Sequence, residues 1–102
     1  MTRKRSYPQC PSTIDGSLEI SKTKSGVFIG GDPEGLRSLA RLLIWLADMD
    51  QESHPSMPDG EREHVHLYPD PIYKHLTRFS VTTQLCRLDA KGTGEFPKKY
   101  RP

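Results

Sequence analysis

The sequence predicts an α+β domain in which four antiparallel strands form one sheet and a single long helix packs on one face of it. Two observations predict this fold. Apolar residues recur at helical spacing from residue 36 to residue 49, and two pairs of short segments with strand-like patterns flank this stretch. The order is therefore β-β-α-β-β, and two hairpins around one helix pack most simply as a helix on an antiparallel sheet.

The first hairpin is expected between residues 17 and 31. Polar and apolar side chains alternate from Ser17 to Thr23, with Leu18 and Ile20 on one face. A polar turn that ends at Gly26 leads into the apolar run at residues 27–29. Two glycines then release the chain into the helix.

The helix marks its own start. Asp32 can accept a backbone N–H, Pro33 suits the first helical position, and Glu34 places negative charge at the positive end of the helix dipole. The stripe expected to face the sheet consists of Leu36, Leu39, Ala40, Leu43, Leu46 and Ala47. A second apolar flank predicts contact with another copy of the chain or with a covering loop: Leu42, Trp45 and Met49.

A second hairpin is expected after a loop over residues 51–60. The first strand runs from Glu63 to Tyr68, residues 72–76 form a loop or one helical turn, and the longest strand covers residues 79–88. The inward side chains are expected to be Val65, Leu67, Phe79, Val81, Thr83 and Leu85. The opposite face of the sheet is expected to carry Glu19, Ser21, Phe28, His64, His66, Tyr68, Ser80, Thr82, Gln84 and Cys86.

Length and composition indicate one domain with a modest core, because only 33% of the 102 residues are hydrophobic. Residues 1–15 are predicted to be a disordered basic tail, residues 16–90 the α+β domain and residues 91–102 a flexible basic tail. We expect no membrane span and no signal peptide, and hence a cytoplasmic protein with Cys10 and Cys86 as free thiols.

The net charge of +2 divides unevenly along the chain. Six Lys and Arg residues near the two ends supply +6, and the other nine face all 13 Asp and Glu residues, which leaves the rest of the chain at −4. Phosphate contacts need clustered positive charge, so this part of the chain is not expected to bind a duplex. Nucleic-acid binding through the tails is the first alternative function, and it would use Arg3, Lys4, Arg5, Lys98, Lys99 and Arg101.

His64 and His66 are the first candidates for chemistry. On a strand they point the same way, about 6–7 Å apart, and two imidazoles at that distance can share a metal. A metal site needs a third ligand, which the fold would have to supply from His54, Asp70, His75 or Cys86. We therefore expect no metal and no cofactor, and interpret His64, His66 and Tyr68 as a contact surface. A metal-binding protein or enzyme at these histidines is the second alternative.

The glycine-rich stretch before the helix does not predict a phosphate site. Residues 30–35 contain neither the P-loop pattern nor Gly-x-Gly-x-x-Gly, and Asp32 and Glu34 would repel phosphate. Cys86 in a strand is interpreted as a small packing residue and not as a nucleophile. No catalytic residue is predicted, and the chain is not expected to be an enzyme.

Residues 31–48 read GDPEGLRSLARLLIWLAD and are followed, after a loop, by His64-Val65-His66-Leu67. This pattern resembles small uncharacterised bacterial proteins that are grouped with the immunity proteins of polymorphic toxin systems, over about residues 17–88. The resemblance implies a single α+β domain that binds and neutralises a cognate toxin, with no catalytic residues. We therefore interpret the chain as a protein-binding module whose partner is another protein or a second copy, with candidate contacts at His64, His66, Tyr68, Trp45, Leu42 and Met49.

Overall fold

The computed structural model describes residues 9–11 and 13–95. Within them the chain forms β1 (Leu18–Thr23), β2 (Gly26–Gly31), α1 (Pro33–Asp48), β3 (His64–Leu67) and β4 (Thr83–Cys86). The element order and the α+β class are as the sequence predicts. Among the described residues no helix is long and apolar enough to cross a membrane.

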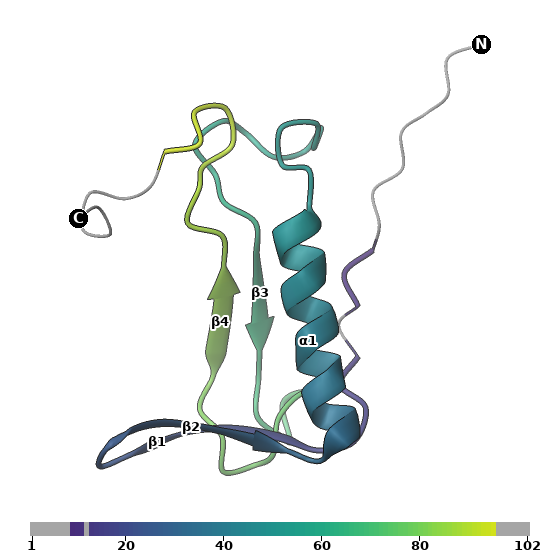
Figure 1. The fold of residues 1–102 in the computed structure, drawn as a ribbon, viewed down its shortest axis with the longest axis vertical. Helices are drawn as coiled ribbons and strands as arrows, with labels where there is room; N and C mark the ends of the chain where they lie inside the picture. The colour runs from purple at the N-terminus through teal and green to yellow at the C-terminus, as the bar shows by residue number, and fades with distance from the viewer. Residues whose placement is uncertain (1–8, 12, 96–102) are drawn as a thin grey trace.

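The strands form two separate antiparallel pairs, so the prediction of one four-stranded sheet was wrong. β1 pairs with β2, with Ile20 opposite Ile29, and β3 pairs with β4, with Val65 opposite Leu85. Figure 1 shows the β1–β2 hairpin running across one end of the β3–β4 pair, while α1 lies alongside β3.

The four strands do not form one sheet because an irregular segment, residues 77–81, bonds to the edge of β1 that β2 leaves free. The backbone N–H groups of Thr77 and Val81 donate to the carbonyls of Leu18 and Ile20 at 2.9 and 2.8 Å. Between them, the Ile20 N–H donates to the hydroxyl of Ser80, which is buried and not on an open sheet face as predicted. A side-chain hydroxyl thus takes the place of a backbone carbonyl as hydrogen-bond acceptor at this strand edge. As a result β4 begins only at Thr83, and Phe79, predicted to be inward, is 78% exposed.

The core gathers side chains from β1, α1, β3, β4 and the segments before β1 and after β3. Leu18, Ile20, Val65 and Leu67 are buried, which confirms their predicted inward position. The buried cluster consists of Ile14, Leu18, Ile20, Leu42, Val65, Leu67 and Leu76, with Cys10, Leu39, Trp45 and Leu85 packed against it. Because Ile14 is one of its members, the packed domain extends into the stretch that the sequence analysis assigned to a tail.

The face that α1 turns to the core overlaps the predicted stripe only at Leu39 and Leu46. Its buried residues are Gly35, Ser38, Leu42 and Leu46. Leu36 and Leu43, both predicted to be inward, are 45% and 46% exposed. The helix face that was assigned to a second copy or to a covering loop, with Leu42, Trp45 and Met49, instead packs in this chain's own interior.

Close contacts near the start of the helix account for this rotation. A Cβ added at Gly35 would lie 1.9 Å from the carbonyl oxygen of Ser17, so only glycine allows the helix to approach the chain there. The buried Ser38 hydroxyl accepts the N–H of Asp15 at 2.9 Å and lies 2.9 Å from the Glu34 carbonyl. These two small residues set the orientation of the helix, and the larger apolar residues follow.

The two ends of α1 are held by residues from outside it. At the N-terminus Asp32 accepts the N–H groups of Gly35 at 2.7 Å and Ser17 at 3.1 Å, which lowers the pKa of its carboxyl group. This confirms the predicted cap. At the C-terminus the last turn has no basic residue. There Arg87 donates to the carbonyls of Leu46 and Met49, both at 2.9 Å.

Arg87 is fixed in turn by its neighbours. Its guanidinium donates two hydrogen bonds, at 2.8 and 2.6 Å, to the Asp89 carboxylate. The pair raises the pKa of Arg87 and lowers that of Asp89. The buried Gln51 donates to the Asp89 carbonyl and accepts the N–H of Glu63. One polar network therefore joins the end of α1 to the chain before β3 and after β4.

The orientation of α1 can be tested with two adjacent leucines. Leu42 is fully buried and Leu43 is about half exposed. Leu42→Ala leaves a cavity and should lower the free energy of unfolding by about 2–5 kcal/mol. Leu43→Ala should lower it by less than about 1 kcal/mol. Urea unfolding in dilute solution measures both, and the reverse order would contradict the observed helix orientation.

The role of Arg87 predicts a second stability effect. Arg87→Met keeps most of the aliphatic stem, removes bonds to buried carbonyls and should cost about 1.5–3 kcal/mol. Arg37→Met, which removes only an exposed pair with Glu34, should cost less than about 0.5 kcal/mol.

The pH dependence of unfolding gives a further readout of the same pair. The folded-state pKa of Asp89 is lowered from its ordinary value of 3.8, so its contribution is complete above that pH and is lost as the pH falls below it. Arg87→Met should therefore weaken this acid-dependent loss. An unchanged acid profile would contradict the pairing.

Candidate functional site

One face of β3 carries a row of aromatic rings that continues into the next loop. The ring centroids of His64 and His66 are 5.0 Å apart, and those of His66 and Tyr68 are 6.0 Å apart. Beyond them Tyr73 lies 5.2 Å from Tyr68 and 5.5 Å from His75. We call these five residues the aromatic row.

A tight loop brings the second half of the row back to β3. Leu76 is buried in the core, its N–H donates to the Tyr68 carbonyl at 3.2 Å, and its carbonyl accepts the Asp70 N–H at 3.0 Å. His75 Nδ1 accepts the Tyr68 N–H at 3.1 Å, which fixes its ring beside that of Tyr68. The row is therefore preformed by backbone bonds and by one buried leucine.

His75 also borders a shallow groove beside β1. A hollow of about 460 Å³ is lined by His75, Lys74, Arg78 and Phe79 on one side and by residues 16–19 on the other. A second hollow of about 270 Å³ continues past Leu18 and Glu19 to Phe28. Because both are lined by residues 17–19 and Thr77, they form one groove that meets the aromatic row at His75.

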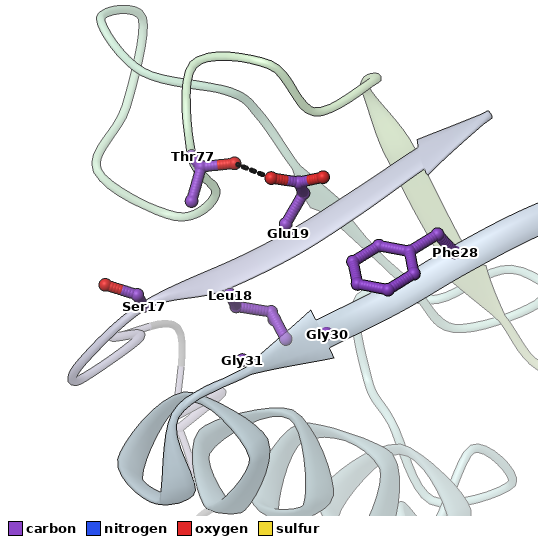
Figure 2. Close-up of a pocket in the computed structure, with 7 residues that line it drawn as sticks. All are labelled: Ser17, Leu18, Glu19, Phe28, Gly30, Gly31 and Thr77. Carbon is purple, nitrogen blue, oxygen red and sulfur yellow. Dashed lines mark hydrogen bonds between the residues drawn. The ribbon is translucent and has the colours of Figure 1, made fainter. Parts of the chain in front are cut away.

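Two exposed phenylalanines flank this groove. Figure 2 shows the Phe28 ring lying along β2 beside Gly30, where a Cβ would come within 2.5 Å of the ring. At the other side the guanidinium carbon of Arg78 lies 5.7 Å from the ring centroid of Phe79. On the groove floor the Glu19 carboxylate accepts the hydroxyl of Thr77 at 3.3 Å (Figure 2). It also accepts the hydroxyl of Ser21 at 3.0 Å. The glycine thus gives the Phe28 ring room to lie flat.

The arrangement is suited to contact with a macromolecule. Tyrosine, phenylalanine and arginine supply large contact areas, and they dominate the binding energy of protein interfaces. Within the described ranges no group of three His, Cys, Asp or Glu residues is placed to hold a metal ion. The His64 ring nitrogen Nδ1 instead lies 3.1 Å from the Arg62 carbonyl.

The structure separates the predicted contact residues into two groups. His64 and His66 lie on the outer face of β3, opposite Cys86 and Gln84 of β4, and Tyr68 follows directly after the strand with its ring beside that of His66. Leu42, Met49 and the half-buried Trp45 belong to the interior. Both cysteines are free thiols, as predicted, and burial, helped by Glu63, raises the pKa of Cys10. The six basic tail residues lie outside the described residues.

Two parts of this surface were not predicted from the sequence. Tyr73 was not named, although Tyr73-x-His75 repeats the i, i+2 spacing of His64-x-His66-x-Tyr68 and could have suggested a second run of rings. Phe79 was placed in the core. Its exposure depends on Ser80 reaching β1, which no pattern of hydrophobicity signals.

Comparison with known protein families identifies the family to which this chain belongs. The family model described as Immunity protein 32 matches residues 26–87, which is more than half of the sequence. The chain belongs to the Immunity protein 32 family. The expected grouping with the immunity proteins of polymorphic toxin systems is thereby confirmed. The matched range runs from the start of β2 to Arg87 and so includes α1 and the whole aromatic row of this family member. No curated protein and no solved structure matched the chain.

The histidines of the row predict weak metal binding at most. None of the described residues completes a metal site with His64 and His66, so zinc titration should show no tight, stoichiometric binding in the histidine ring NMR signals. His64→Ala and His66→Ala should leave the titration nearly unchanged. Stoichiometric zinc binding that either variant abolishes would support the metal alternative instead.

Proposed function

We propose that this chain is an immunity protein that binds and neutralises a cognate toxin. The observation that carries the proposal is the match of the Immunity protein 32 family model to residues 26–87. The chain acts by occupying the toxin, without chemistry of its own, in the cytoplasm of the cell that it protects.

The toxin contacts the aromatic row and the adjoining groove. His64, His66 and Tyr73 are exposed, whereas Tyr68 and His75 are partly buried, and the backbone bonds of the loop hold the second half of the row in place. A preformed surface loses little side-chain entropy when a partner binds. Lys74 and Arg78 at the groove, together with Glu19 and Asp70, add charges of both signs with which a protein partner can pair.

Growth rescue tests the function directly. The toxin-like reading frame beside the gene is expressed in a bacterial host with and without this chain. The chain should restore growth that the toxin domain alone stops, and the two proteins should purify together. A neighbourhood without such a reading frame, or a toxin that kills equally in both strains, would overturn the proposal.

Two variants test the surface in the same system. Tyr73→Ala and His66→Ala should each weaken binding of the toxin domain by about 10-fold or more in calorimetry, because they remove exposed rings from a preformed contact. Val27→Ala truncates an exposed apolar residue outside the row and is the matched control. Rescue with unchanged affinity in both row variants would keep the immunity function but reject this surface.

A further inference from the structure

The outer face of α1 is apolar although nothing in the described chain covers it fully. Leu36, Leu43 and Ile44 are 45%, 46% and 61% exposed, and Ala40 and Ala47 are exposed as well. At ~100° per residue these five side chains occupy the arc from about 100° to 200° away from the buried Leu42. The charged residues of the helix, Glu34, Arg37, Arg41 and Asp48, all fall on the remaining arc.

The residues of this arc have the spacing of a helix-pairing seam. Leu36, Ala40, Leu43 and Ala47 follow each other at intervals of four, three and four, which is the a/d spacing of a heptad pattern. Large and small side chains alternate along it. Two helices can approach to about 8 Å where a large side chain of one faces a small side chain of the other.

The alternation is self-complementary only in an antiparallel pair. A two-fold axis midway between residues 40 and 43 brings Leu36 of one copy to Ala47 of the second copy. It also brings Ala40 to Leu43 of the second copy. In a parallel pair each leucine would instead meet its own equivalent, and the alanine layers would be left underfilled.

The charges beside the seam also favour the antiparallel pair. Arg37 and Asp48 lie on one flank of α1, eleven positions apart. In the antiparallel pair Arg37 lies within about 3 Å, along the axis, of the level of Asp48 in the second copy. A parallel pair would set Arg37 beside Arg37 and Asp48 beside Asp48. The helix dipoles also oppose each other in the antiparallel pair.

We propose that a second copy of this chain binds the outer face of α1 in an antiparallel, two-fold symmetric dimer. One four-turn helix seam buries less than the ~1,200–2,000 Å² of a standard interface, so the dimer is weak, with a Kd of about 10⁻⁶–10⁻⁴ M. The seam is separate from the aromatic row, so the dimer does not depend on the proposed toxin.

Sedimentation velocity of the full chain tests self-association. Over ~1–500 µM, which brackets that Kd range, the average mass should rise from monomer toward dimer. Leu43→Glu places a charge on the seam and should keep the chain monomeric throughout. Lys24→Glu, which changes the charge of the exposed β1–β2 turn, is the matched control and should associate like the unaltered chain. The melting temperature confirms that both variants are folded.

Disulfide capture tests the direction of the pair in a Cys10→Ser, Cys86→Ser background. Leu36→Cys alone should not cross-link, because two copies of position 36 lie about 16 Å apart along the axis of an antiparallel pair. Adding Ala47→Cys should give a covalent dimer, because positions 36 and 47 then come within the ~7 Å Cα–Cα limit of a disulfide.

Three results would overturn the proposal. One is a monomer at every concentration, as expected if residues of the tails cover the helix of their own chain. Another is a dimer that Leu43→Glu leaves intact. The third is efficient cross-linking by Leu36→Cys alone, which would indicate a parallel pair. If Leu43→Glu abolished toxin binding by a chain that is monomeric throughout, the face would belong to the toxin.

Discussion

The polar contacts at the two ends of α1 link parts of the domain that no common sheet connects. The two strand pairs share no backbone ladder, so the bonds from Thr77 and Val81 to β1 and the two helix caps join them. At one end Asp32 receives N–H groups from the helix and from the chain entering β1. At the other, Arg87 comes from beyond β4 to satisfy carbonyls that the helix leaves open. Each cap therefore also sets the position of a strand pair.

The distribution of polar groups explains why so small an apolar core suffices. Ser38, Gln51 and Ser80 are the buried polar side chains of the described chain, and each bonds to backbone at a junction between elements. Within the described part of the chain no buried side-chain nitrogen or oxygen lacks a hydrogen-bond partner. These bonds add specificity where apolar area is scarce, because a wrong arrangement of the elements would leave the buried polar groups without hydrogen-bond partners.

Much of the fold could be predicted from local signals. The helix cap, the first hairpin and the alternation of Val65 and Leu67 all follow from short patterns that the final structure keeps. The rotation of α1 could not be predicted, because its outer arc is as apolar as its inner one and the decision rests on Gly35 and Ser38. A hydrophobicity pattern gives no sign of either residue, although Gly35 permits a close approach to Ser17 that any other residue would prevent.

The candidate surface, too, could be predicted from the sequence only in part. His64, His66 and Tyr68 could be grouped from strand periodicity alone. Tyr73 and Phe79 could not be placed. The position of Tyr73 depends on a loop that Leu76 closes, and that of Phe79 depends on the Ser80 hydroxyl, which accepts a hydrogen bond from the backbone of β1. Ser80 bonds to Ile20, 60 positions away in the chain, and Leu76 is fixed by its burial in the core, and neither contact leaves a local pattern.

The alternation along β3 has a consequence for how such a protein can change over evolutionary time. Val65 and Leu67 serve the interior, whereas His64 and His66 between them serve the outside. Exchanges at outward positions typically alter stability by only about ±0.5 kcal/mol. A lineage can therefore explore new outward side chains on this strand, one at a time, without first acquiring compensating changes inside. Recognition can diverge rapidly on a scaffold that stays the same.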